Sequence, residues 1–374
     1  MTLYIGLMSV TSLDGVDGVL ADLQDGPAGR PRVLAHRHLP LQTPVQQQLL
    51  LLNRRGDDEL HRAALAGNEL MQCYASVVAE LLRTGEVEPA QVRAIGAHGQ
   101  TVRHRPQEFD ALGGYTLQLM NGALLAELCG IDVVCDFRSR DLAAGGQGAP
   151  LVPALHAALF ASAADNVAVL NLGGIANLTL LPVGGEVLGF DCGPGNALLA
   201  PTVQQHLGTV FDDAGRWAAS GHVDEALLQH LLAEPYLARP PPKSTGRDLF
   251  HMPWLQAALQ QAAPAVSPVD VQATLTEFSA RAAIDALQRY GPRTRRLLVC
   301  GGGVFNAHLM QRLATLLPQA LVQSTAASGM PPQQVEALAF AWLAQAFVLR
   351  QPGNLPSVTG ARGPRLLGAL YPAR

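Results

Sequence analysis

Two carboxylates and several hydroxyls lie close together near the start of the chain, in the segment MSVTSLDGVDG, Met8 to Gly18. Two apolar runs that are typical of strands, LYIGL and VLADL, flank this segment. A turn between strands leaves backbone N–H groups unpaired, and hydroxyls beside them add donors, so such a turn can hold a phosphate. Asp14 or Asp17 would offer Mg²⁺ the oxygen ligands that it prefers. The alternative is an ordinary β-turn rich in Ser and Asp.

A second turn of small residues lies in NLGGIANLT, where Gly173 and Gly174 allow a backbone to approach a ligand closely. The segment GFDCGPGN follows, and Asp191 ends the strand there, so its carboxylate is expected to project toward whatever the turn lines. A lone Asp at a strand end is more often a turn or capping residue. If Asp191 lies opposite two turns that can bind phosphate, however, a role as general base is the better interpretation.

Three consecutive glycines, Gly301, Gly302 and Gly303, lie between an expected strand and an expected helix in VCGGGVFNAHLM. This position favours nucleotide binding at a helix N-terminus. A dinucleotide-binding fingerprint would need a further glycine where Asn306 stands, so we reject that interpretation. The segment PPKSTGRD contains Lys243 but lacks the preceding glycines of a Walker A motif.

Two polar clusters, AHGQT with Thr101 and DFRSRD with Arg138, follow expected strands in the first half of the chain. An arginine in such a cluster either forms a structural salt bridge or binds a sugar or a carboxylate. The residues alone leave both interpretations open.

The elements that must position these residues follow one pattern twice. Residues 3–40 are expected to form three strands in a meander, and residues 166–196 repeat the order strand, glycine or polar turn, strand, turn, strand. Helical spacing of apolar residues follows each meander, over residues 45–85 in the first half and near residues 223–234, 252–263 and 270–290 in the second. Two such meanders would place two turns across a cleft.

The length of 374 residues exceeds the roughly 250 to 300 at which one core stops growing, so two domains are expected. We predict that residues 1–145, completed by residues 350–374, form the first domain and residues 146–349 the second. The boundary falls in the glycine-rich segment RSRDLAAGGQGAPLVP.

Charge and composition narrow the class of partner. A net charge of −4 and a pI near 6.2, without a basic run, predict no nucleic-acid partner and favour a small molecule. Five scattered cysteines predict no disulfide framework and no zinc site. The N-terminus does not resemble a signal peptide, and no apolar stretch reaches the length of a membrane span, so a cytoplasmic protein without a membrane partner is expected.

Several long motifs in one order resemble a known family, that of the anhydro-N-acetylmuramic acid kinases, within the actin and sugar-kinase ATPase superfamily. The motifs that carry the resemblance are GLMSVTSLDGVDG, AIGAHGQTVRH, CDFRSRDLAAGGQGAPLVPA, LNLGGIANLTLL, GFDCGPGN, PPKSTGRDLF, VCGGGVFN and VTGARGPRLLGALYP. The resemblance implies an α/β architecture with a duplicated RNase H-like, actin-like ATPase fold, in which two domains enclose an interdomain cleft. It also implies ATP and Mg²⁺ as cofactors and a homodimer.

The reaction that the resemblance implies opens 1,6-anhydro-N-acetylmuramic acid with water and phosphorylates O6. The products would be N-acetylmuramic acid 6-phosphate and ADP, during cell-wall recycling. The alternatives are a degenerate ATP-binding protein of the same fold that has lost turnover and a kinase for another amino sugar.

The resemblance also implies roles for single residues. Asp191 matches the catalytic base, Asp14 is the expected metal ligand, and the residues near the sugar are Thr101, Arg138 and Glu336. The residues expected to bind the nucleotide are Val10, Thr11, Ser12, Leu13, Asp14, Gly15, Val16, Asp17, Gly173, Gly174, Gly301, Gly302 and Gly303.

The chain departs from the family pattern at two positions, Val10, where Gly is usual, and Ala200, where Asp is usual. Because valine at positive φ costs ~1 to 2 kcal/mol, we expect Val10 in the β region with its side chain turned away from the nucleotide.

Overall fold

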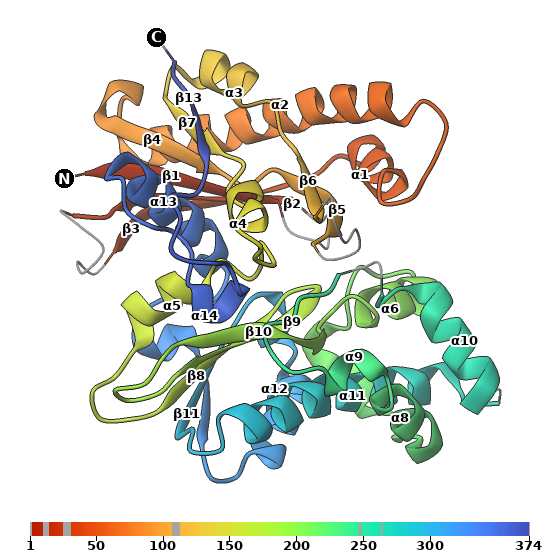
Figure 1. Cartoon of the computed structure of the whole chain (residues 1–374). Coiled ribbons are helices and arrows are strands. Elements are labelled where there is room, and N and C mark those ends of the chain that lie inside the picture. Colours follow the sequence, from red (N-terminus) through yellow and green to blue (C-terminus); the bar gives the residue numbers. More distant parts are fainter. Residues whose placement is uncertain are drawn as a thin grey trace. The chain divides into compact units, whose positions relative to one another are not determined.

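The computed structural model describes residues 2–9, 15–24, 31–106, 113–246, 249–262 and 265–373. The chain divides into two compact units. One contains Met1–Leu159 with Gln333–Arg374, and the other contains Phe160–Pro332. Each unit contains a mixed sheet with helices packed on it (Figure 1).

The elements of the first unit fall into a main sheet, a separate hairpin and helices. The main sheet contains β1 (Leu3–Ser9), β2 (Gly15–Asp22), β3 (Arg32–Pro40), β4 (Val92–Ala97), β7 (Val133–Cys135) and β13 (Ala369–Tyr371). The hairpin is β5 (Gln100–Arg105) with β6 (Tyr115–Leu119). The helices are α1 (Thr43–Leu51), α2 (Glu59–Gly85), α3 (Gly122–Cys129), α4 (Ser139–Ala143), α5 (Pro153–Phe160), α13 (Val335–Val348) and α14 (Pro356–Thr359).

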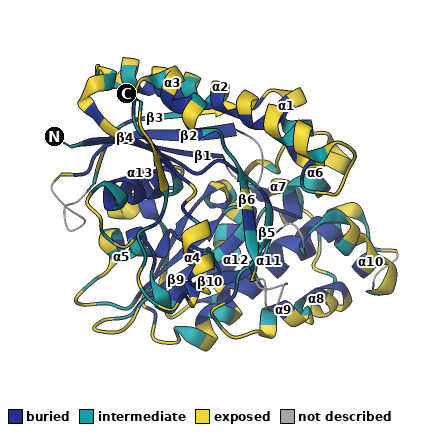
Figure 2. Ribbon diagram, turned by 45° about the horizontal axis from the view of Figure 1, so that its top comes forward, coloured by how far each residue is buried: buried dark blue, intermediate teal, exposed yellow. Residues whose placement is uncertain are grey.

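The apolar segments of the first unit explain its layers. Strand β1 is buried along its whole length, as expected of a central strand, and it pairs with β2 on one side and β4 on the other. Helix α2 buries one stripe, with Leu70, Tyr74, Val77 and Leu81 at spacings of three and four residues. Figure 2 shows the central strands and α13 mostly in the dark blue of buried residues.

Two glycines bring α13 against the first sheet. A Cβ atom at Gly6 would lie 1.9 Å from the carbonyl oxygen of Ala337, and one at Gly96 would lie 1.9 Å from that of Phe340. Because backbone atoms cannot move aside as a flexible side chain does, only glycine allows this contact between helix and strands. Helix α13 is therefore a part of the first unit.

The elements of the second unit are a five-stranded sheet and helices. The strands are β8 (Val167–Leu172), β9 (Ile175–Leu181), β10 (Leu188–Pro194), β11 (Arg296–Cys300) and β12 (Leu321–Ser324). The helices are α6 (Leu199–Leu207), α7 (Arg216–Ala219), α8 (Glu225–Leu232), α9 (Pro235–Ala238), α10 (Met252–Ala262), α11 (Pro268–Tyr290) and α12 (Ala307–Leu316).

The two main sheets share one topology. The first contains the order β3-β2-β1-β4-β7 and the second the order β10-β9-β8-β11-β12. In each, the first three strands form an antiparallel meander and the last two run parallel to the meander's first strand. This is the RNase H-like order, present twice. The α/β fold class predicted from the sequence is confirmed.

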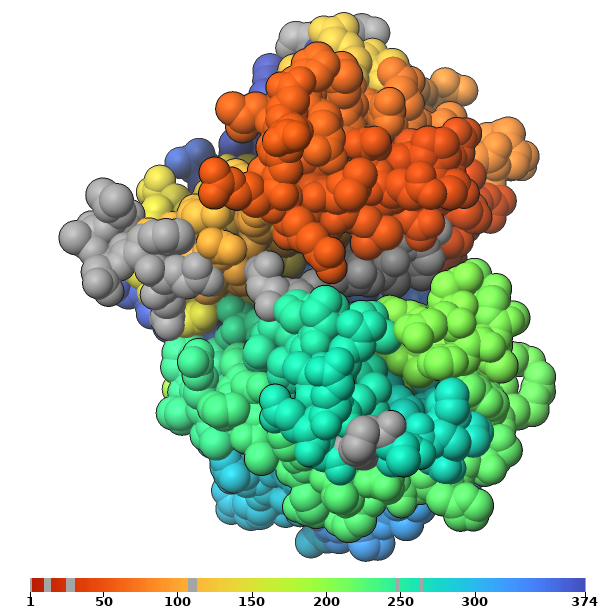
Figure 3. Space-filling model, turned by 90° about the vertical axis from the view of Figure 1, so that its right-hand side faces the viewer, coloured from red at the N-terminus to blue at the C-terminus, as the bar shows by residue number. Residues whose placement is uncertain are grey.

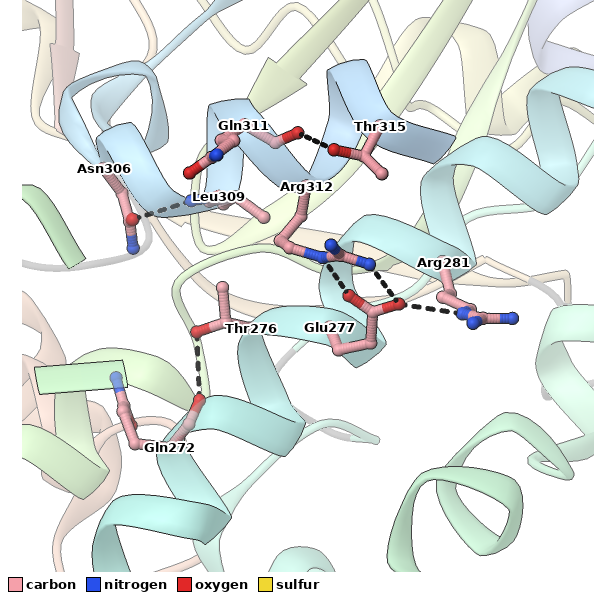
Figure 4. A network of polar contacts seen from close by, with 9 residues as sticks. All are labelled: Gln272, Thr276, Glu277, Arg281, Asn306, Leu309, Gln311, Arg312 and Thr315. Carbon is pink, nitrogen blue, oxygen red and sulfur yellow. Dashed lines mark hydrogen bonds and ion pairs between the residues drawn. The ribbon is translucent and has the colours of Figure 1, made fainter. Parts of the chain in front are cut away.

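Two apolar clusters form the core of the second unit. One lies between the sheet and helices α11 and α12, and the other gathers α6, α8, α9 and α10 around the first half of α11. Figure 3 shows the outer surface of α8 to α10 in green and teal. Glu277 of α11 and Arg312 of α12 form an ion pair of 2.7 Å that joins the two helices (Figure 4).

The boundaries of the units differ from those that we predicted. The first unit extends to Leu159 instead of residue 145, and its C-terminal part begins at Gln333 instead of residue 350. The physical reason for the second difference is the packing of α13 on Gly6 and Gly96. Its apolar spacing indicated a buried helix but not which sheet it covers.

The five cysteines, which all lie among the described residues, form no disulfide bond. No helix within the described part of the chain has the length and apolar character needed to cross a bilayer.

Candidate active site

Asp191 lies on one face of the second sheet. Its neighbours Phe190 and Cys192 belong to the core beneath α11. Because successive side chains of a strand point to opposite faces, Asp191 points away from that core. The side chain is nonetheless only 7% exposed, so its carboxylate occupies a sheltered position.

The remote residues 236–245 form three hydrogen bonds with Asp191. The N–H of Thr245 donates to Oδ2 of Asp191 at 2.9 Å, and the N–H of Asp191 donates to the carbonyl oxygen of Lys243 at 3.2 Å. The hydroxyl of Tyr236 donates to the carbonyl oxygen of Asp191 at 3.0 Å. A backbone N–H on a carboxylate oxygen stabilises the ionised form and fixes its orientation.

Two asparagines continue the row across the sheet. Asn177 of β9 pairs with Asp191 and also with Asn171 of β8, so the three side chains share one face. Facing residues of paired strands have Cβ atoms roughly 4.5 to 5.5 Å apart. The Oδ1 atoms of Asn171 and Asn177 are buried and accept no hydrogen bond in this structure. They are buried acceptors that the protein's own donors leave unsatisfied, which is uncommon in a folded chain.

The turn at Gly173 and Gly174 packs against the GPGN segment. The carbonyl oxygen of Gly174 accepts from the N–H groups of Gly195 and Ala197, and that of Gly173 accepts from Asn196 at 2.8 Å. A Cβ atom on Gly195 would lie 2.3 Å from the carbonyl oxygen of Gly173, so glycine is required for this approach. The turn is therefore held close to the end of the strand that bears Asp191.

The three-glycine segment lies beside the same turn. Gly301 has a φ of 80°, and a Cβ on Gly303 would lie 2.5 Å from the side chain of Leu172, at the end of β8. Helix α12 begins only at Ala307, and the side chain of Asn306 already accepts from the N–H of Leu309 at 2.9 Å. The glycines thus lie between β11 and α12, as predicted, and border the carboxyl end of the sheet through a 3₁₀ turn.

The predicted phosphate loop of the first unit is described only in part. Val10, Thr11, Ser12, Leu13 and Asp14, and with them the predictions for the Val10 backbone and for the metal ligand, lie outside the described residues.

The described residues of that loop belong to β2. Gly15 begins β2, and Val16 is fully buried in the core, so its side chain cannot contact a nucleotide there. The Asp17 carboxylate contacts Nε2 of His36 at 3.1 Å and Nδ1 of His38 at 3.2 Å.

Thr101 and Arg138 belong to one polar cluster of the first unit. Nε2 of Gln118 donates to the hydroxyls of Thr101 at 3.1 Å and Thr116 at 2.7 Å, and Thr116 in turn contacts Nδ1 of His104 at 3.1 Å. The positive charge of Arg138 acts on His104 as well. The structure therefore brings the two predicted residues into one neighbourhood.

The cluster around Arg138 includes two histidines, His98 and His104, that are neutral near pH 7. Nε and Nη2 of Arg138 lie 3.0 and 2.9 Å from Nε2 of His98, and Nη1 donates to the carbonyl oxygen of Gly148. Burial, and then the charge of Arg138, hold the pKa of His98 well below 6.5 and lower that of His104 to about 3. Both rings are neutral near pH 7, so Arg138 supplies the positive charge.

Glu336 lies in the first turn of α13, partly buried. Its predicted place near the sugar stays a prediction.

Within the described ranges, no three or more His, Cys, Asp or Glu side chains are arranged to hold a metal ion.

Sequence reasoning did not single out Asn177, Tyr236 or Thr245. The alternation in IANLTLL places Asn177 on the polar face and was a usable signal. No comparable signal existed for residues 236–245, because only the folded chain brings them to Asp191.

The family described as anhydro-N-acetylmuramic acid kinase matches residues 2–373. A relative of that name from Variovorax paradoxus (strain S110) is 60% identical over 378 residues, which cover 99% of each chain. One from Bordetella petrii is 60% identical and covers 99% of this chain and 96% of the relative. One from Cupriavidus metallidurans is 56% identical, with coverage of 99% and 97%.

Proposed function

Because the chain belongs to the anhydro-N-acetylmuramic acid kinase family, we propose that it uses ATP to phosphorylate 1,6-anhydro-N-acetylmuramic acid. Water opens the anhydro bridge, O6 receives the phosphoryl group, and the products are N-acetylmuramic acid 6-phosphate and ADP. The observation that carries the proposal is the sheltered carboxylate of Asp191, held by Thr245. Relatives with this name at 60% identity favour a kinase over a degenerate binding protein.

Asp191 acts as the general base in this proposal. Its carboxylate takes a proton from the water that attacks the anomeric carbon. The bond from that carbon to the bridging O6 breaks, and O6 attacks the γ-phosphoryl group in line while ADP leaves. General-base help of this kind contributes ~10² to 10⁴-fold in rate. The acceptor oxygens of Asn177 and Asn171, on the same face, would orient the water or a sugar hydroxyl.

The nucleotide would lie along the glycine turns. Residues 10–17, except the buried Val16, would bind the phosphates, and the turns at Gly173 and at Gly301 would allow the nucleotide to approach the backbone. Mg²⁺, bound through Asp14, would neutralise charge on the phosphates, since phosphoryl transfer depends mainly on positioning and charge stabilisation.

The sugar would bind at the Arg138 cluster, which contains Thr101, His98 and His104. The guanidinium of Arg138 suits the carboxylate of a muramic acid, and the Thr101 hydroxyl suits a sugar hydroxyl. Glu336 would complete this site. The family resemblance also supports a homodimer that acts in the cytoplasm during cell-wall recycling.

The test is ADP release by the purified protein with the anhydro sugar, compared with the intact reducing sugar. We expect release that depends on the anhydro sugar, and a fall of kcat by at least about 10²-fold in Asp191→Asn. Asp213→Asn is the matched control, because Asp213 is an exposed carboxylate of the same unit. Absence of sugar-dependent ADP release would disprove the function, and full activity of Asp191→Asn would disprove the base.

A further inference from the structure

Lys243 is the only lysine of the chain, which contains 25 arginines among its 26 basic residues. Its side chain is 5% exposed. Burying an ammonium group costs free energy unless its donors are satisfied. A chain that otherwise uses arginine throughout thus keeps one lysine, at a position where its charge is almost fully buried.

The ammonium group of Lys243 is held at the end of helix α9. Nζ donates to the carbonyl oxygens of Tyr236 at 3.2 Å and Leu237 at 3.0 Å. It also lies 4.8 Å from the ring centre of Tyr236 and 5.8 Å from that of Phe190, close enough for cation–π attraction. Among the described residues, no carboxylate lies within ion-pair distance of Nζ.

These contacts close a ring of interactions around Asp191. Lys243 fixes the backbone of Tyr236, whose hydroxyl donates to the carbonyl oxygen of Asp191. The carbonyl oxygen of Lys243 accepts from the N–H of Asp191, and Thr245, two residues further, donates to its carboxylate. The N–H, the carbonyl oxygen and one carboxylate oxygen of Asp191 thus form hydrogen bonds with Lys243 or with residues that it holds.

The charged and titratable groups around Lys243 come from three elements. Asp191 and Cys192 lie on β10, Arg239 follows α9, and Arg289 lies in the last turn of α11. Burial and the two arginines lower the pKa of Lys243, whereas Cys192 and Asp191 raise it. The interaction with Asp191 is mutual, so the ammonium charge favours the ionised carboxylate.

We propose that Lys243 is a positioning residue for Asp191, which holds residues 243–245 against α9 and thereby fixes the orientation and charge of the Asp191 carboxylate. The inference rests on the proposed function, in which Asp191 is the base. The compact ammonium group fits between two carbonyl oxygens and two rings. The guanidinium of arginine is larger, planar and carries five donors, so it would leave donors unsatisfied in this space.

The kinetic test uses Lys243→Met, which keeps the length of the side chain but removes its charge and donors. We expect kcat to fall about 10- to 100-fold with KM within about threefold, because a displaced base loses rate while binding remains. The acidic limb of the profile of kcat/KM against pH moves to higher pH, because the loss of a nearby positive charge favours protonated Asp191. Arg216→Met, which removes an exposed charge elsewhere in the same unit, should leave both unchanged.

Two further variants keep the inference testable if Lys243→Met does not fold. Tyr236→Phe keeps the ring below Nζ but removes the bond to Asp191, and kcat should fall about 3- to 10-fold. Lys243→Arg keeps the positive charge, so the acidic limb of kcat/KM against pH should stay in place. Its kcat should still fall, because the guanidinium does not fit the site. An unchanged kcat and an unchanged limb in Lys243→Met or Tyr236→Phe would overturn the inference.

A second readout does not depend on activity. Protein labelled with ¹⁵N-lysine gives one side-chain ammonium signal, because the chain has one lysine. Asp191→Asn should shift that signal, and Asp213→Asn should not. If Asp191→Asn leaves the ammonium signal of Lys243 unchanged, the interaction between Lys243 and Asp191 is refuted, even if the enzyme is active. If the wild type released no ADP with the sugar, the proposed function would fail, and this shift would still decide the coupling.

Discussion

In β2, neighbouring side chains determine the charge of the Asp17 carboxylate. Burial by itself raises the pKa of Asp17, but the hydrogen bonds from His36 and His38 outweigh it, and the net pKa lies below its ordinary value of 3.8. The folded state therefore favours the ionised form more than the unfolded state does. The stabilisation is present above about pH 3.8 and is lost as the pH falls through the lower, folded pKa.

Asp17→Asn should lower the free energy of unfolding by about 1 kcal/mol at pH 7, because it replaces a charge-assisted contact with a neutral one. The difference from the wild type should shrink as the pH falls below 3.8. Urea unfolding at pH 7 and at pH 3 measures both values. An equal difference at the two pH values would contradict the assignment of the stabilisation to the ionised carboxylate.

At the scale of elements, one buried acid joins helices α11 and α12. Glu277 is 3% exposed and accepts from Nε and Nη2 of Arg312 and from Nε of Arg281 (Figure 4). Burial raises its pKa, but the hydrogen bonds from the two arginines outweigh it, so the pKa lies below its ordinary value of 4.5. Both carboxylate oxygens are thus paired inside the unit.

Glu277→Gln should destabilise the second unit by about 2 to 3 kcal/mol at pH 7, because it leaves two arginines without their shared charge. The loss should diminish as the pH falls below 4.5, since the wild-type acid is then protonated in the unfolded state. Glu225→Gln is the control, because Glu225 is exposed and its partner is the neutral Gln229. Urea midpoints of the variants, measured by circular dichroism, decide the comparison. Equal midpoints would contradict the prediction.

At the scale of the whole chain, a buried carboxylate ties the C-terminal segment to the first unit. Asp141 is fully buried and accepts from the N–H of Gly148 at 2.8 Å, from Nδ2 of Asn354 at 2.6 Å and from the hydroxyl of Thr359 at 2.8 Å. The last two residues are 213 and 218 positions away along the chain. The first unit is complete only when its final segment returns.

Asp141→Asn should lower the stability of the first unit by about 3 kcal/mol or more, because the new NH₂ group faces donors in a buried site. Thr359→Val, which removes one of the three bonds, should cost about 1 to 2 kcal/mol, and Thr359→Ser, which keeps the hydroxyl, much less. Urea midpoints and the rate of proteolysis within residues 333–374 measure these effects. A neutral Thr359→Val would show that the tie depends on the other two bonds.

The sequence by itself determined the elements and most of the candidate chemistry. Periodic apolar residues predicted α2, α8, α10 and α11, because local spacing decides which face of a helix is buried. Turn residues and the order of the motifs indicated Asp191 and the glycine turns. Helix α2 ends at Gly85, with Glu86 as its C-cap. A Cβ on Gly85 would lie 2.5 Å from the side chain of Leu20.

Only the tertiary structure decided which distant residues meet. The return of α13 to the first sheet depends on close contacts at Gly6 and Gly96, and the support of Asp191 depends on Lys243 and Thr245, more than fifty residues away. Such contacts leave no period in the sequence, because the partners belong to different elements and contribute single residues. Local pattern therefore indicated Asp191 as the proposed base, and long-range packing determined which residues hold Asp191 in place.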